Sequence, residues 1–558
     1  MPTVAFDRYY RYADLTAILE AYATEFPGLV ELESIGKSHE GRDIWLVTVT
    51  DRSTGPALEK PAFWVDGNIH ASEVSASTAA LKLLDKLAQG NHSLLATHTF
   101  YIVPRLNPDG AEWALEDPPR IIRSSTRPYP YDEDDFYGIE RKDMDGDGRI
   151  LWMRVQDDNG PWIVSELDSR LLRKRRPDEF GGPGCYRLLP EGIFHNWDGL
   201  TLRNRAVKEG LDMNRNFPSG WRMESEQHGA GPFPTSEPEI HASVSAICKR
   251  PNICGAVCFH TFSGVHLRPS GRHADEDMPA EDLWNFKVIG DKGFEMTGYP
   301  AISNYHEFRY HPKEVITGVF DDWMYEHRGV FSWTTEIWSP QRQAGITDYK
   351  YIDWFRDHPH EDDLKMLQWS DTALDGKGHI DWQEFDHPQL GTVEIGGWDR
   401  EYAFRNPPLK YLENEVSPLA DWVIWHASVS PRLGISKVVA EGARVRVLVQ
   451  NLGWLPTYVT KMAQDKKVCR GVVAEISKVG EPLVSEGAKE PAWLLSGKLR
   501  TQGPQLEGRS GIGAAASMSW GDLGNEDQTI FEWSLAPGEY ELTFRHERAG
   551  TVRTRVSV

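Results

Sequence analysis

Cysteine is scarce in this sequence. Five cysteines are spread irregularly over 558 residues: Cys185, Cys248, Cys254, Cys258 and Cys469. An odd, scattered set of this kind gives neither a disulfide framework nor a four-cysteine zinc site. Cys254 and Cys258 lie in or beside the apolar run GAVCFH, so we predict buried thiols on a strand. The beginning of the sequence also lacks the basic and then apolar layout of a secretory signal. We therefore expect a reducing, cytoplasmic setting.

Positive charge is in deficit as well. The chain has 61 Lys and Arg residues against 83 Asp and Glu residues, a formal net charge of -22. This balance would repel a polyanion, so we expect no nucleic-acid partner. No apolar run approaches the roughly 20 residues that a membrane-spanning helix needs, so we expect no membrane partner either. Composition leaves the oligomeric state open.

Length and hydrophobic content are both ample. A chain of 558 residues exceeds what one core supports, and 40% hydrophobic residues with 21 Trp predict at least two folded domains. In residues 1–428, helical spacing as at Leu15, Ile18 and Tyr22 alternates with strand-like runs such as PAFWVDGNIH. This alternation predicts an α/β domain with a mixed, mostly parallel sheet flanked by helices. Residues 429–558 alternate with period two, which predicts a separate β-sandwich.

Two segments of the first domain stand out. From about 116 to 200, Pro, Asp, Arg and Gly dominate, and we expect a long irregular insertion that forms a lid or wall. Further along, Ser236-Glu237-Pro238-Glu239 is a capping-box pattern, which predicts a helix that begins here and ends near Ile247.

Three residues could hold a metal ion. His70 ends a predicted strand and Glu73 lies in the first turn of the next helix, so both can point at one ion. His260 ends the apolar run GAVCFH and is the best third ligand; a core histidine bonded to a neighbour is the alternative. In an α/β domain, ligands gather where strands end. The spacing alone is weak, because His-x-x-Glu also occurs at His273/Glu276, His311/Glu314 and His358/Glu361.

Further polar residues lie in contexts that suggest chemistry. Asn214 and Arg215, in LDMNRNF, combine an amide with a planar fork that can clamp a carboxylate, although a polar turn is an equal reading. Glu336 interrupts the β-rich run FSWTTEIW. A carboxylate buried in such a strand is costly unless it has a hydrogen-bonding partner or a function, and acting as a general base is one such function.

In their order along the chain, these motifs resemble one family. The opening IGKSHEGRDI, His-x-x-Glu, NPDG, Asn-Arg-Asn, SEPE, a histidine at a strand end, Asp-Asp-Trp and a strand glutamate follow the order found in carboxypeptidase A-type zinc metallocarboxypeptidases, or funnelins. The resemblance covers about residues 9–336. It implies a zinc carboxypeptidase-like fold over residues 1–428, and a hydrolase for peptides with a free C-terminal carboxylate.

The resemblance also implies roles for individual residues. His70, Glu73 and His260 match the zinc ligands, and Asp212 matches a carboxylate that orients a ligand histidine. Asn214 and Arg215 match the pair that holds the terminal carboxylate of the substrate. Glu336 matches the general base for a zinc-activated water. Arg123, in RIIRSSTRP, matches the arginine that stabilises the transition state, with Arg120 and Arg127 as nearby rivals.

Two features bear on substrate choice. Asp321 falls where family members that prefer Lys or Arg place an acidic selector; capping the following turn is the alternative. The family usually has a mobile Tyr before the Asp-Trp motif, but ungapped counting reaches Glu314, and Tyr310 lies somewhat earlier. The residue that takes this place stays open.

A second metal is a further expectation. Asp143, Asp145 and Asp147 alternate around Gly146, like the first half of a calcium loop, but Arg154 stands where an EF-hand has a bidentate Glu. We expect a truncated calcium site that stabilises the insertion. The alternative is a solvated acidic loop that binds no ion.

Two other functions remain open. One is an amidohydrolase of the same fold that acts on cell-wall peptides, N-acyl amino acids or poly-glutamyl tails. The other is a non-catalytic, metal-binding protein for adhesion or carbohydrate binding. Retention of both histidines, Glu73 and Glu336 favours an enzyme.

Overall fold

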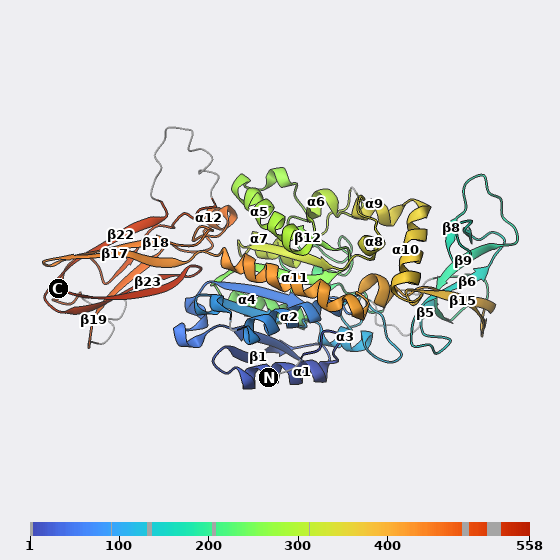
Figure 1. Ribbon diagram of the computed structural model, residues 1–558, viewed down its shortest axis with the longest axis horizontal. Coiled ribbons are helices and arrows are strands. Elements are labelled where there is room, and N and C mark those ends of the chain that lie inside the picture. The colour runs from blue at the N-terminus through green and yellow to red at the C-terminus, as the bar shows by residue number, and fades with distance from the viewer. Residues whose placement is uncertain are drawn as a thin grey trace.

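The computed structural model describes residues 4–90, 92–130, 137–203, 208–311, 313–481, 490–510 and 526–558. Along the long axis of the molecule, a large sheet with its helices occupies the middle, and a smaller β region lies at each end (Figure 1). One end region is the C-terminal part of the chain, and the other includes the segment 138–195. No helix within the described ranges is long and apolar enough to cross a membrane.

The central sheet has eight strands in the order β1-β2-β4-β3-β11-β14-β12-β13. Neighbours β4–β3, β3–β11, β11–β14 and β12–β13 run parallel, whereas β1–β2, β2–β4 and β12–β14 run antiparallel. The predicted mixed, mostly parallel sheet is therefore confirmed. The strands are β1 (Val30–Lys37), β2 (Asp43–Val49), β3 (Ala62–Gly67), β4 (Thr99–Val103), β11 (Ile253–Thr261), β12 (Val265–Arg268), β13 (Ala301–Ser303) and β14 (Phe331–Ile337).

Helices cover both faces of this sheet. In β3, Phe63 and Val65 pack into one hydrophobic core, while Ala62 and Trp64 pack into another on the opposite face. The first core is completed by α1 (Tyr12–Glu25), α2 (Ser75–Gln89), α5 (Ala280–Thr297) and α11 (Leu409–Ser428). The second is completed by α4 (Pro238–Cys248) and α7 (Phe320–Glu326). A sheet buried on both faces explains the near-continuous apolar runs of its central strands.

The sheet brings the ends of three strands together. β3, β11 and β14 are adjacent and parallel, and His260 of β11 lies in register with Glu336 of β14. Their carboxyl ends therefore share one edge of the sheet, from which the β3–α2 connection carries His70 and Glu73.

The described part of the segment 116–200 is not irregular throughout, contrary to the sequence prediction. It contains β5 (Gly138–Arg141), β6 (Trp152–Gln156), β7 (Trp162–Val164), β8 (Leu172–Lys174), β9 (Cys185–Pro190) and β10 (Gly192–His195). β5 and β10 form a two-stranded antiparallel sheet, and the other four join β15 (His379–His387) and β16 (Gly391–Trp398) in a six-stranded antiparallel sheet. Met153, Leu189 and Ile395 pack in its core. The strands were missed because they are short and half-exposed, and because β6 pairs with a strand from the far end of the domain.

The C-terminal region is a sandwich of two antiparallel four-stranded sheets, as predicted. The sheets have the orders β17-β18-β22-β20 and β21-β19-β23-β24. Val447, Trp533 and Phe544 are among the residues of the core between them. The strands are β17 (Leu433–Glu441), β18 (Arg444–Asn451), β19 (Val473–Lys478), β20 (Leu494–Ser496), β21 (Arg500–Gln502), β22 (Gln528–Leu535), β23 (Glu539–His546) and β24 (Gly550–Ser557). The boundary at 428/429, at the end of α11, stays a prediction.

Arg548, between β23 and β24, joins the sandwich to the central region. Its side chain is 1% exposed and donates hydrogen bonds to the carbonyl oxygens of Gly329 (2.9 Å), Tyr458 (2.7 Å) and Arg328. Arg328 and Gly329 form the turn between α7 and β14, so a sandwich residue holds a turn that precedes the strand of Glu336.

The remaining helices connect these parts. They are α3 (Pro108–Ala114), α6 (Asn304–Glu307), α8 (Pro340–Gln343), α9 (Tyr351–Arg356), α10 (His360–Ala373) and α12 (Lys461–Asp465), with the short turns η1 (Arg52–Thr54), η2 (Ala57–Glu59), η3 (Ser93–Ala96), η4 (Met213–Arg215) and η5 (Asp275–Asp277), and the π-helical turn η6 (Arg400–Arg405). Helix α4 begins where SEPE predicts, but without the expected cap: Glu239 accepts a hydrogen bond from the His39 N–H instead.

Candidate metal centre

The turn between β3 and α2 is shaped by two residues that precede His70. A Cβ on Gly67 would lie 2.7 Å from the carbonyl oxygen of Ala76, so only glycine allows the strand and helix to approach so closely. Asn68 adopts a left-handed conformation (φ 60°), and its side-chain amide donates to the carbonyl oxygens of His70 (2.6 Å) and Ala71 (3.2 Å). This turn fixes the backbone that carries His70.

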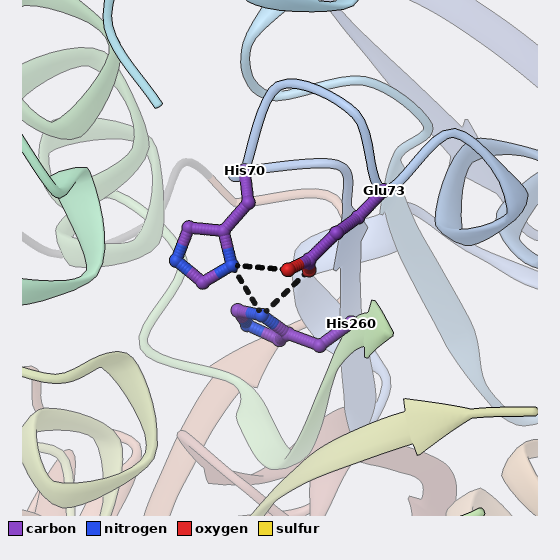
Figure 2. A group of neighbouring side chains, drawn as sticks. All are labelled: His70, Glu73 and His260. Atoms are coloured by element: carbon purple, nitrogen blue, oxygen red, sulfur yellow. Dashed lines mark hydrogen bonds and ion pairs between the residues drawn. The ribbon is translucent and has the colours of Figure 1, made fainter. Parts of the chain in front are cut away.

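Figure 2 shows His70, Glu73 and His260 converging on one point. His70 Nδ1 lies 2.9 Å from Glu73 Oε1, His260 Nδ1 lies 3.1 Å from His70 Nδ1, and His260 Nδ1 lies 3.2 Å from Glu73 Oε2. All three side chains are at least 95% buried. One ligand atom from each lies within 4.8 Å of the others, which is compact enough for a single ion.

The second nitrogen of each imidazole is engaged away from this point. His70 Nε2 lies 3.1 Å from Asp212 Oδ1, and His260 Nε2 lies 3.1 Å from Cys258 Sγ. Such partners orient an imidazole and leave its other nitrogen for a metal. Asp212 was expected in this place from the sequence. Cys258 was expected only as a buried thiol, and no pattern in the sequence marks its contact with His260.

The donor set fits zinc. Two imidazole nitrogens and one carboxylate are a ligand set of catalytic zinc sites, which keep a further position open for water. Burial lowers the pKa of His260, which favours the neutral form that binds metal. Burial alone would raise the pKa of Glu73, but the neighbouring His70 and His260 outweigh it and hold that pKa well below its usual range. These directions favour ligands that are deprotonated at neutral pH.

Among the three candidate arginines, Arg123 is the one beside this cluster. Its Nη1 donates to Glu73 Oε1 (3.2 Å) and its Nε donates to Asp212 Oδ2 (3.0 Å). Arg120 is engaged by Glu116 at 2.7 Å, and Arg127 donates to Glu237 at 2.6 Å and 3.0 Å. The two rivals therefore have other partners.

Glu336 lines the same cavity as His70 and His260. Its Oε2 is buried and has no hydrogen-bond partner in the part of the chain that the structure describes. Burial, and then the charge of Glu73, raises the pKa of Glu336 well above its usual range. A cation at the neighbouring donors would favour the ionised form of Glu336. The arrangement leaves a carboxylate oxygen available to a small polar group at the metal position.

The cavity also contains the predicted carboxylate clamp. Asn214 and Arg215, in turn η4, line it together with Arg123. Asn214 Oδ1 accepts from the Phe320 N–H at 2.9 Å, which ties this turn to the start of α7 and leaves the amide NH₂ as the donor. Arg215 Nη1 donates to the Asn214 carbonyl oxygen at 2.7 Å. The free donors of this pair suit a carboxylate.

Asp321 lies on the wall of this cavity and is 1% exposed. Its Oδ2 accepts from Asn304 Nδ2 at 2.7 Å, and burial raises its pKa to about 6. Val319, the N-cap residue of α7, provides no side-chain cap, whereas backbone hydrogen bonds from Asp321 and Asp322 in the first turn act on the Asp321 carboxylate. Capping of this turn therefore stands beside substrate selection as a role for Asp321.

Tyr310 is a cavity residue that the sequence left unassigned. It lines the cavity with Arg123, Arg215 and Glu336, yet half of its surface is exposed. Ungapped counting gave Glu314, because the length of the loop between α6 and α7 cannot be read from the sequence. Glu314 is not among the lining residues of this cavity.

The acidic loop gathers a different set from the one expected. Asp143 and Asp145 come together with Glu191, which is fully buried between the N–H groups of Met144 (2.5 Å) and Leu151 (2.7 Å). Asp147 instead lies 3.6 Å from the Arg149 guanidinium and accepts from the Arg149 N–H at 2.8 Å. The third member of the set was missed because β9 brings Glu191 from a distant position in the chain.

Comparisons with known proteins give two family matches. A model described as zinc carboxypeptidase matches residues 15–355, and a model of a domain of unknown function matches residues 432–557. Curated relatives include carboxypeptidase B of Astacus astacus, 31% identical over 112 residues, which are 20% of this chain and 36% of that protein. A metallocarboxypeptidase A-like protein of Trichophyton verrucosum is 24% identical over 291 residues, which are 50% of each chain. The chain thus spans half or less of the length of these relatives.

One similar solved structure is carboxypeptidase A from Helicoverpa armigera. It is 18% identical, with a TM-score of 0.42, over 66% of this chain and 74% of that one.

Proposed function

Because the chain belongs to the zinc carboxypeptidase family, whose model matches residues 15–355, we propose that it is a zinc metallocarboxypeptidase that removes the C-terminal residue of peptides. The proposal depends above all on one cavity. His70, His260, Glu336 and the Asn214–Arg215 clamp line it. Glu73 lies against both histidines, and one oxygen of Glu336 is unpaired among the described residues. A metal site, a base and an anchor for a carboxylate are the parts that an exopeptidase needs.

The anchor sets where the substrate is cut. The free C-terminal carboxylate of a peptide binds the guanidinium of Arg215 and the amide of Asn214 by charge-assisted hydrogen bonds. The last residue then occupies this cavity. Only the last peptide bond can then reach the position between Glu336 and the two histidines.

The chain's own residues account for proton movement and charge stabilisation. When bound, zinc supplies Lewis-acid polarisation and makes water acidic enough to ionise near pH about 7. Glu336 takes the proton of the attacking water and delivers it to the leaving amine. Arg123 donates to the oxygen on which negative charge develops, a contact of a kind that contributes about 3 kcal/mol. Tyr310 covers the cavity from its exposed side.

We further propose a preference for Lys or Arg at the C-terminus. A buried Asp321 carboxylate on the cavity wall would pair with a basic side chain of the departing residue. Comparing hydrolysis of peptides that end in Lys, Phe and Glu tests this specificity. Faster release of Lys supports it, and faster release of Glu contradicts it without affecting the proposed reaction.

The reaction itself is tested by profiling the residues released from a peptide library. We expect single C-terminal residues to appear, release to stop after dialysis against a chelator, and activity to return with one equivalent of zinc. The Glu336→Gln variant, loaded with zinc, is the matched negative control. Cleavage within peptides, or release that persists in this variant, would contradict the proposal.

A structural calcium ion at the insertion is a separate part of the proposal. Asp143 and Asp145 supply exposed oxygens beside the buried Glu191, and carboxylates are the ligands that calcium prefers. Calorimetric titration with calcium, with the Asp145→Asn variant as control, measures it. If titration of the unaltered protein releases or absorbs no heat, the loop does not bind calcium and is a solvated acidic loop. The cytoplasmic setting stays a prediction.

A further inference from the structure

A second, larger cavity lies beside the candidate site. Its volume is about 620 Å³, and its lining is rich in cations: Arg120, Arg123, Arg141, Lys208 and Arg405. Two carboxylates, Glu140 and Glu209, also line it. Glu140 lies 2.5 Å from His195 Nε2. In a chain whose formal net charge is -22, a cavity with more cations than carboxylates is a local reversal of charge.

This cavity adjoins the reaction centre on one side. Arg123 lines both this cavity and the one that holds Glu336, whereas Asn214 and Arg215 line only the latter. Arg405 Nη1 donates to Ser72 Oγ at 2.5 Å, next to the metal-ligand candidate Glu73. A peptide whose terminal carboxylate is held by Arg215 therefore runs past Arg123 into the second cavity. The residues before the scissile bond occupy it.

The cations of this cavity differ in how far they are neutralised. Arg123 is paired with Asp212 and Glu73, Arg120 with Glu116, and Arg405 lies 3.6 Å from Glu401. Arg141, at the end of β5, has no ion pair or side-chain hydrogen bond within the described ranges. Burial lowers its pKa; the charge of Glu401 opposes this effect, and the charge of Arg405 adds to it.

Arg400 adds to this positive region. It lines a small adjoining cavity together with Arg141 and one carboxylate, Glu401, and it too has no ion pair among the described residues. Burial and then the charges of Arg405 and Arg141 lower its pKa. Like charges held this close destabilise one another and are relieved by an anion.

We propose that this cavity binds an acidic side chain of the substrate, so that preferred peptides carry Glu or Asp just before the residue that is removed. The inference rests on the proposed function, because the direction in which the peptide lies follows from binding of its terminal carboxylate by Asn214 and Arg215. It assigns Arg141, with Arg405, to recognition of the upstream part of the peptide. Both come from segments outside the central sheet: Arg141 from the insertion and Arg405 from η6.

The test uses three peptides that end in the same residue and carry Glu-Glu, Gln-Gln or Lys-Lys at the two preceding positions. For the zinc enzyme we expect kcat/KM to be about tenfold higher for the Glu peptide than for the Gln peptide, the equivalent of about 1.4 kcal/mol. The preference should shrink at high salt, because the cavity is open to solvent. The Arg141→Gln variant should bring the ratio close to one, and Arg141→Glu should shift the preference toward the Lys peptide.

A matched control removes one positive charge at the other end of the molecule. Lys437 is exposed on β17 of the sandwich, far from β5 (Figure 1), so Lys437→Gln should leave the ratio unchanged. Equal kcat/KM for the Glu and Gln peptides would overturn the inference and leave the proposed function standing. An Arg141→Gln variant that keeps the full preference would also overturn it.

Binding separates failure of the inference from failure of the proposed function. Fluorescence anisotropy of labelled Glu and Gln peptides with the Glu336→Gln variant measures recognition without turnover. We expect a Kd about tenfold lower for the Glu peptide. If no peptide is cleaved by the unaltered enzyme, the proposed function fails, and equal Kd values in this assay would then overturn the acidic preference as well.

Discussion

The buried guanidinium of Arg548 allows a sharp test of what holds the sandwich to the central region. It donates to three carbonyl oxygens and has no carboxylate partner among the described residues. The carbonyl of Gly329 also accepts from Thr460 Oγ1 at 2.8 Å. The carbonyl of Tyr458 likewise accepts from the Thr460 N–H at 3.0 Å. In an Arg548→Met variant, one carbonyl among the described residues, that of Arg328, would therefore lose the only donor shown for it.

The magnitude follows from this count. Each buried carbonyl left without a donor costs about 1–3 kcal/mol, and removal of a buried charge returns part of that cost. We expect Arg548→Met to lower the free energy of unfolding by about 1–3 kcal/mol. Arg553→Met is the matched control: it removes an ion pair with Glu59 across the same interface, but Arg553 is 43% exposed and Arg545 also contacts Glu59. Such an exposed pair contributes about 0–1 kcal/mol.

Scanning calorimetry of the full chain measures both variants. For Arg548→Met we expect the transition of the sandwich to fall by roughly 4–12 °C, and for Arg553→Met by a few degrees at most. Peptide hydrolysis at 25 °C by the folded fraction should be unchanged, because Arg548 touches no cavity residue of the site. Equal shifts for the two variants would show that the buried carbonyls do not stabilise the interface, and the reasoning would be wrong.

Three further predictions concern the site. Glu336→Gln should retain one equivalent of zinc by elemental analysis while kcat falls about 10²–10⁴-fold; near-normal turnover would remove Glu336 from the role of base. Asp212→Asn should weaken zinc binding about 10–100-fold in competition with a chelator, since Asp212 orients His70; an unchanged affinity would show that this contact is dispensable. Asp321, whose pKa burial raises to about 6, is protonated below that pH and ionised above it. KM for a Lys-terminal peptide should therefore rise as pH falls through about 6 while KM for a Phe-terminal peptide does not, and parallel profiles would contradict the basic pocket.

Local patterns were enough to predict part of the site. His70, Glu73 and His260 each lie where an apolar strand ends, and the parallel order of β3, β11 and β14 brings such ends to one edge. The local sequence could not show which of Arg120, Arg123 and Arg127 lies beside the metal-ligand candidates. The choice depends on Asp212, 89 positions away in the chain, and on the partners of the rival arginines.

What the sequence did not predict depends on contacts between distant segments. Glu191 joins Asp143 and Asp145 through sheet pairing, and Tyr310 reaches the cavity on a loop whose path no periodicity encodes. The strands of the insertion alternate too briefly to give a signal. One of them, β6, also pairs with β16, which lies beyond the whole central sheet in the order of the chain.

The pairing of β6 with β16 has a consequence for biosynthesis. Arg154 and Glu394, which face each other across these strands at 2.7 Å, are 240 positions apart. At about 5–20 residues per second, a ribosome needs roughly 10–50 s to supply the second strand after the first. During that interval the edge of β6 that will pair with β16 is unpaired in the nascent chain. Until synthesis reaches residue 398, this edge must therefore be kept from pairing with other chains.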